Sequence, residues 1–229
     1  MNQSILVWDL PTRVFHWSLV CAFAGAMITA DSHRLLLAHA VCGYLLLLLV
    51  GFRLVWGIAG SRYARFSEFV RGPTAVITHL RSLFGGNPAR HVGHNPAGAV
   101  AIIGLLVLGG VAATSGLATL NSIGGKPMKE FHESVGNIML ALAIAHLLGV
   151  IVTSFLLREN LVLSMFTGCK GGAPEYAVKT NHGLIALLLL IVLAVFAWAL
   201  AQGQLPTLLD PATVAEKMSK EHHHRKHDE

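Results

Sequence analysis

The stretch FHESVGNIMLALAIAHLLGVIVTSFLL, residues 131–157, decides the fold of this chain. The run is predominantly apolar, and it exceeds the roughly 20 residues that an α-helix needs to cross ~30 Å of hydrocarbon. It contains His132 and His146, and ionisable side chains inside a membrane helix are costly and usually functional. The stretch therefore predicts a transmembrane helix that carries two functional histidines.

The rest of the chain has the composition of a membrane protein. Of its 229 residues, 54% are hydrophobic and 13% are charged, whereas a soluble domain carries about 25% charged residues. The first apolar run lacks a basic leader and contains His16, so we interpret it as a retained helix and not a signal peptide. With residues 131–157, four further apolar runs predict five crossings: residues 14–30, 35–58, 97–120 and 182–201.

Basic residues in the links predict the orientation of these helices. Without the tail after residue 202, ten lysines and arginines fall on one side and three on the other, and the richer side is cytoplasmic by the positive-inside rule. That side holds the N-terminus and the links 59–96 and 158–181. We therefore predict a multi-pass membrane protein with its C-terminus outside, which is the periplasm in a Gram-negative cell. Residues 67–70 and 75–84 predict an amphipathic interfacial helix in the first link, ended by residues 85–88.

Spacing places His132 and His146 on one face of their helix. Fourteen steps of ~100° leave them about 40° apart, and in a bundle wound at 3.5 residues per turn they align. Their separation along the axis is about 21 Å, so one lies near each face of the membrane. On the predicted topology His132 is the outer histidine and His146 is the inner one.

Two more histidines provide a partner at each depth. His16 lies at the cytoplasmic start of the first helix, and His39 at the outer start of the second. The predicted pairs are His16 with His146 and His39 with His132. Two imidazoles that face each other across a helical bundle make a bis-histidine haem site, and filled axial positions suit electron transfer. We therefore predict two haems, and the absence of a C-x-x-C-H motif excludes covalent c-type attachment.

Other histidines and other site types are weaker candidates. Zinc would need three or four ligands at one depth, and a proton-driven transporter would need acids in mid-membrane. His33, in the outer turn, competes with His39 as a ligand. His182 and Asn95 are candidates for contact with a haem or a quinone at the cytoplasmic face. The loop histidines are expected to be solvated or interfacial: His79, His91 and His94.

Two arginines lie near the predicted haem levels. Arg13 is one turn from His16, and Arg53 is near the cytoplasmic end of the second apolar run. Each is a candidate cofactor-binding residue, since arginine pairs well with the propionate groups of haem. Positive-inside anchoring explains both arginines equally well.

Several motifs resemble one family. VWDLPTRVFHW at 7–17, GFRLVWG at 51–57 and GSRYARF at 60–66 are similar to the signatures of bacterial cytochrome b561-type proteins. That family includes the b-type cytochrome subunits of membrane nickel-iron hydrogenases. GHNPAG at 93–98 and RENL at 158–161 also fit, so the resemblance covers about residues 5 to 170.

The resemblance implies a four-helix haem-binding bundle whose first, second and fourth helices supply the iron ligands. Its ligand positions fall on His16, His39, His132 and His146, as the spacing also predicts. It implies haem b as the cofactor, and electron exchange with quinone or quinol and with a redox partner protein. The fifth helix and the polar tail depart from the four-helix form and leave the partner open.

The predicted fold class is an all-α membrane protein, a four-helix haem-binding transmembrane bundle plus a fifth transmembrane helix. Residues 1–160 are predicted to form the di-haem bundle, and 161–201 a cytoplasmic link with the fifth helix. Residues 202–229 are predicted to be a polar periplasmic tail, which we expect to be mobile. Its histidine-rich end could bind metal or a partner, and solvated disorder is the favoured interpretation.

These features favour a cytochrome that passes electrons between the quinone pool and a periplasmic redox partner, with a c-type cytochrome expected. The alternative is a membrane-anchor cytochrome b subunit of a hydrogenase-like oxidoreductase complex that passes electrons to quinone. A third class is a transporter or a structural anchor without haem. Membrane lipid and quinone are expected partners, and a homodimer is left open. Nucleic acid is not expected, because the basic residues lie in the links between apolar runs.

Overall fold

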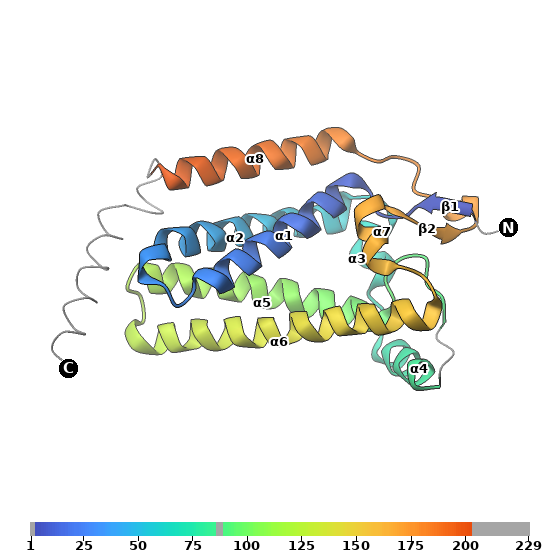
Figure 1. Cartoon of the computed structure of the whole chain (residues 1–229), viewed down its shortest axis with the longest axis horizontal. Helices are drawn as coiled ribbons and strands as arrows, with labels where there is room; N and C mark the ends of the chain where they lie inside the picture. The colour runs from blue at the N-terminus through green and yellow to red at the C-terminus, as the bar shows by residue number, and fades with distance from the viewer. Residues whose placement is uncertain (1–2, 86–88, 203–229) are drawn as a thin grey trace.

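The computed structural model describes residues 3–85 and 89–202, and within these ranges five long helices form a bundle (Figure 1). They are α1 (Leu10–Thr29), α2 (Leu36–Ala59), α5 (Pro96–Leu120), α6 (Gly125–Leu157) and α8 (Gly183–Ala201). α2 packs against α1 and α5, α6 packs against α5, and α8 lies along α1 and α2. The predicted all-α membrane bundle is confirmed. The predicted polar tail, apart from its first residue, lies outside the described residues.

Length and composition suit the long helices to a membrane. In the described part of the chain, four of them are long and apolar enough to span it: α2 with the short turn before it, α5, α6 and α8. α1 has 20 residues and packs beside α2 and α8, but Arg13 and His16 make its first turns more polar. The fifth predicted crossing therefore rests on the length of α1 and on its place in the bundle.

α6 is longer than its apolar run predicts. It begins at Gly125, after Gly124 adopts a left-handed conformation with φ of 78°, and not at residue 131. Its first turns are polar and include an ion pair between Lys126 and Glu130 at 3.6 Å. Because the hydropathy pattern marks only the apolar part of a helix, these turns were missed. His132 therefore lies inside the helix and not at its end.

The shorter elements gather at one end of the bundle, the end at which the described chain begins (Figure 1). α3 (Phe66–Phe69) and α4 (Pro73–Phe84) occupy the first basic link, close to the predicted positions, and α7 (Leu161–Thr167) follows α6. β1 (Gln3–Leu6) pairs with β2 (Cys169–Gly172) as an antiparallel ribbon, with Gln3 opposite Gly172. The ribbon was not predicted, and it ties the N-terminus to the link before α8. The domain boundary at residue 160 stays a prediction.

Asp9 links the start of α1 to the end of α2 at this end of the bundle. Its Oδ1 accepts a hydrogen bond from the backbone N–H of Thr12 at 3.0 Å and so caps α1. Its Oδ2 accepts a hydrogen bond from Nε1 of Trp56, near the end of α2, at 3.2 Å. Asp9 and Trp56 are both buried. This carboxylate therefore fixes the first helix against the second.

Replacing Asp9 with alanine would leave two buried N–H donors without their acceptor. We expect Asp9→Ala to lower the free energy of unfolding by about 1–3 kcal/mol, which is the cost of such unpaired groups. The measurement is the Tm of the detergent-solubilised protein. Asp31→Ala, at an exposed aspartate of the opposite end, is the control and should leave the Tm unchanged. Equal Tm values for the two variants would contradict this role of Asp9.

Candidate functional site

His39, near the start of α2, and His132, in α6, contact each other at the end of the bundle opposite the ribbon. Their ring centres are 6.0 Å apart and their planes are nearly perpendicular, at 87°. Two imidazoles that share one metal ion, with each nitrogen about 2 Å from it, hold their ring centres roughly 6 Å apart. The pair is therefore spaced as a bis-histidine metal site requires, and the competing candidate His33 is exposed.

Backbone carbonyl groups orient both rings of this pair. Nδ1 of His39 lies 2.9 Å from the carbonyl oxygen of Ala26, and Nδ1 of His132 lies 3.0 Å from that of Ala112. Since a carbonyl oxygen only accepts, each Nδ1 carries the proton and each Nε2 keeps a free lone pair. A histidine that ligates a metal commonly donates its other ring N–H in this way. In both rings the nitrogen with the lone pair is therefore Nε2.

A glycine in α5 makes room for the ring of His132. A Cβ atom built at Gly116 would lie 2.8 Å from Cε1 of His132, closer than real Cβ atoms approach. Ser115, next to it, has its Oγ 3.2 Å from Nδ1 of His132. The surface of α5 is therefore shaped to the position of this ring.

At the other end of the bundle, His16 in α1 and His146 in α6 lie within electrostatic range of each other. Nδ1 of His16 is buried and has no hydrogen-bond partner among the described residues. Nη1 of Arg53 and Nδ1 of His94 are also buried without a hydrogen-bond partner among the described residues. Buried polar atoms in native proteins nearly always have partners. This group of orphaned atoms therefore fits a ligand that brings polar groups to this level of the bundle.

Arg53 is deeply buried. Its side chain is 3% exposed, and its guanidinium carbon lies 4.7 Å from the ring centre of Phe66 and 5.7 Å from that of Phe69. A guanidinium keeps its charge when it is buried, and a positive-inside anchor would instead reach the solvated interface. Burial therefore favours the interpretation of Arg53 as an anion-binding residue.

His94 was misjudged from the sequence. It was expected to be solvated or interfacial, but its ring packs against Trp8, at 4.5 Å, and Phe69, at 4.6 Å, measured between ring centres. Burial, reinforced by the nearby charge of Arg53, lowers the pKa of His94 to about 3, so its ring is neutral. His79 is also buried, beside His91, so the same expectation is wrong for His79. The aromatic residues around His94 are distant in sequence, so the chain offered no local signal for its burial.

Three other candidates make contacts that stabilise the fold. Nη1 of Arg13 donates a hydrogen bond to the carbonyl of Phe166 at 2.5 Å, which holds α7 against α1. Oδ1 of Asn95 accepts a hydrogen bond from the backbone N–H of Gly98 at 2.6 Å and caps α5. His182 packs edge-on against Trp56, with ring centres 5.3 Å apart.

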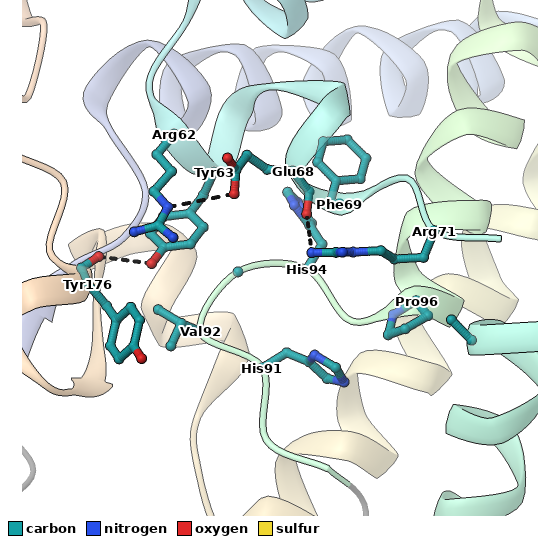
Figure 2. A pocket seen from close by; sticks show the side chains of 12 residues that line it. Arg62, Tyr63, Glu68, Phe69, Arg71, His91, Val92, His94, Pro96 and Tyr176 are labelled. Atoms are coloured by element: carbon teal, nitrogen blue, oxygen red, sulfur yellow. Dashed lines mark hydrogen bonds and ion pairs between the residues drawn. The ribbon is translucent and has the colours of Figure 1, made fainter.

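A cavity of about 360 Å³ lies beside His94, among α3, the loop before α5 and Tyr176 (Figure 2). Tyr63 donates a hydrogen bond from its hydroxyl to the carbonyl of Tyr176 at 2.9 Å, and Arg62 forms an ion pair with Glu68 at 3.6 Å. The volume of this cavity is in the range of small-molecule binding sites. The lining combines aromatic rings with polar groups, which suits a planar ligand that carries oxygen atoms.

The long apolar helices define the class of membrane helical bundles, and within this bundle the rings of His39 and His132 contact each other. The family described as prokaryotic cytochrome b561 matches residues 7–168, and the chain belongs to this family. Comparisons with curated proteins and with solved structures find no match. The protein is therefore a membrane b-type cytochrome, which binds b-type haem and acts in electron transfer.

Adding a methyl group at Gly116 should disturb the ring of His132. We expect Gly116→Ala to lower the haem content per chain, because the new Cβ displaces His132 from its contact with His39. Haem is measured from the absorption of its pyridine complex, relative to protein. Gly136→Ala, on α6, is the matched control, since nothing lies within 4 Å of a Cβ at that position. Normal haem content and an unchanged spectrum in Gly116→Ala would contradict this account.

Proposed function

We propose that this protein is a di-haem cytochrome that transfers electrons between the quinone pool and a periplasmic redox partner. The observation that carries the proposal is the His39–His132 pair, with its ring centres 6.0 Å apart and each Nδ1 bonded to a backbone carbonyl. In this proposal, Nε2 of each ring is an axial ligand of the outer haem iron. When bound, haem iron supplies a one-electron change between its ferrous and ferric states.

The second site is proposed at His16 and His146. α6 carries one histidine of each pair, and the fourteen residues between His132 and His146 correspond to about 21 Å along the axis. Electrostatic proximity of His16 to His146 and the orphaned atoms around them support a ligand at this level. Two sites at different depths suit a protein that carries electrons across the bilayer.

Arg53 is proposed to bind a propionate of the inner haem. Its buried charge and its orphaned Nη1 would be satisfied by a carboxylate, which arginine binds with charge-assisted hydrogen bonds. Arg13 is a weaker candidate, because one of its nitrogens already binds the carbonyl of Phe166. Its Nε, however, is buried without a partner among the described residues.

The cavity beside His94 is proposed as the site at which quinone exchanges electrons with the inner haem. A quinone head group is planar and has two carbonyl oxygens, so it needs apolar walls and a few polar groups, which is the usual form of a small-molecule site. Phe69 and Val92 provide apolar wall, and Tyr63 and His91 provide polar groups. The cavity lies at the end of the bundle that holds the proposed inner pair.

Orientation decides which partners each end can reach. The basic links support a cytoplasmic position for the end that holds α3, α4 and α7. On this proposal the protein lies in the bacterial inner membrane, with its N-terminus in the cytoplasm and its C-terminus in the periplasm. The His39–His132 end would then face a periplasmic partner. Co-purification of a c-type cytochrome would support this direction, and that of a hydrogenase subunit would favour the anchor role.

Removing one proposed iron ligand distinguishes the two proposed haem sites. We expect His146→Ala to bind one haem per chain where the unaltered protein binds two, because only the inner pair loses an imidazole. Haem stoichiometry and the absorption spectrum of the reduced protein are the measurements. His79→Ala, at a buried histidine outside both pairs, should retain two haems. Two haems in His146→Ala would refute the inner assignment.

A bulky side chain in the cavity should block quinone. We expect Val92→Trp to slow the reduction of haem by a soluble quinol at least tenfold, since the indole occupies space that the head group needs. Reduction by dithionite, which needs no binding site, should be unchanged. Val70→Trp, on an exposed valine outside the cavity lining, is the control. Equal quinol rates in the two variants would remove this cavity as the quinone site.

A further inference from the structure

His94 and Arg53 each have a buried nitrogen without a hydrogen-bond partner in the described chain, and both side chains lie against the ring of Phe69. The buried atoms are Nδ1 of His94 and Nη1 of Arg53, neither of which has a partner among the described residues. The ring centre of Phe69 lies 4.6 Å from that of His94 and 5.7 Å from the guanidinium carbon of Arg53. Phe69 therefore contacts both side chains, and each of them has one buried nitrogen without a partner among the described residues.

The ring of His94 is fixed in orientation. Trp8 and Phe69 pack against it with interplanar angles of 52° and 50°. Aromatic packing of this kind restrains the ring but does not satisfy its nitrogen atoms, which still need hydrogen bonds when they are buried. A neutral imidazole offers one N–H donor. Beside the permanent positive charge of Arg53, the most favourable acceptor for that donor is an anion.

The protein's own nearby carboxylate is already engaged. Asp9 accepts hydrogen bonds from the backbone N–H of Thr12 and from the indole N–H of Trp56. His16 and His146, the proposed inner ligands, both lie within electrostatic range of His94. The chemical group expected at this level is thus a carboxylate that arrives with the ligand, and haem b carries two propionate carboxylates.

We propose that His94 is a positioning residue of the inner haem, which donates a hydrogen bond from Nδ1 to a propionate carboxylate that Arg53 also binds. This inference rests on the proposed His16–His146 site. His94 is not an iron ligand in this arrangement. Its hydrogen bond withdraws negative charge from the carboxylate, so the ferric state is less stabilised and the midpoint potential of the inner haem is higher than it would be without His94.

The test uses the full-length holoprotein in detergent and compares His94→Phe with His94→Gln. Phenylalanine preserves the aromatic packing and removes the donor, whereas glutamine retains an N–H donor. We expect both variants to keep two haems and six-coordinate spectra. In His94→Phe the midpoint potential of the inner haem should become more negative, and in His94→Gln most of that shift should be restored. The inner haem is identified as the component of the redox titration that His146→Ala removes.

Infrared spectroscopy provides a second measurement. The redox difference spectrum of the unaltered protein should contain a carboxylate band that shifts in His94→Phe and returns towards its original position in His94→Gln. His79→Gln, at another buried histidine of the same end, is the matched control and should change neither the potential nor the band.

The outcomes separate this inference from the proposed function. Loss of the inner haem, or a five-coordinate spectrum, in His94→Phe would make His94 an iron ligand and overturn the inference. Unchanged potential and infrared bands in His94→Phe would also overturn it. A shift that vanishes when quinone is removed from the sample would assign His94 to the quinone and reject the propionate contact. Failure of the two-site proposal would appear independently, as fewer than two haems in the unaltered protein.

Discussion

A polar group that is buried in an apolar bundle has no water to bind, so it must find a partner within the protein or in a ligand. This requirement organises the structure. Asp9 meets this requirement by accepting hydrogen bonds from the backbone N–H of Thr12 and the indole N–H of Trp56, which joins α1 to α2. His39 and His132 meet it on one side of each ring, through backbone carbonyls, and leave the other side open. At the opposite end Nη1 of Arg53 and Nδ1 of His94 have no partner within the described chain, which points to a ligand.

The need to pair buried polar groups thus leads to two different proposed sites. At the His39–His132 end the protein supplies the orienting acceptors, so the rings are fixed before any ligand binds. At the His16–His146 end several buried nitrogen atoms have no partner among the described residues, so in the proposed site the ligand would supply the acceptors. The first arrangement favours a rigid, prepared site.

The sequence predicted what depends on local pattern. Apolar runs located the five long helices, apart from the polar first turns of α6, and they placed His132 and His146 in one helix. The burial of His94 could not be predicted, since it depends on Trp8 and Phe69, which reach it only through tertiary packing. The strand Cys169–Gly172 was missed because its sequence, CKGG, has no alternating apolar pattern.

The ribbon also has a consequence for the order of assembly. β1 precedes the long helices of the described chain, but its partner β2 follows four of the five. Such a long-range pairing forms late, because the intervening chain must first be ordered. Trp8, which covers one side of His94, follows β1 directly, so it is held in place only when β2 arrives. The end of the bundle that holds Trp8 and His94 therefore reaches its final packing only after α6 and β2 have formed.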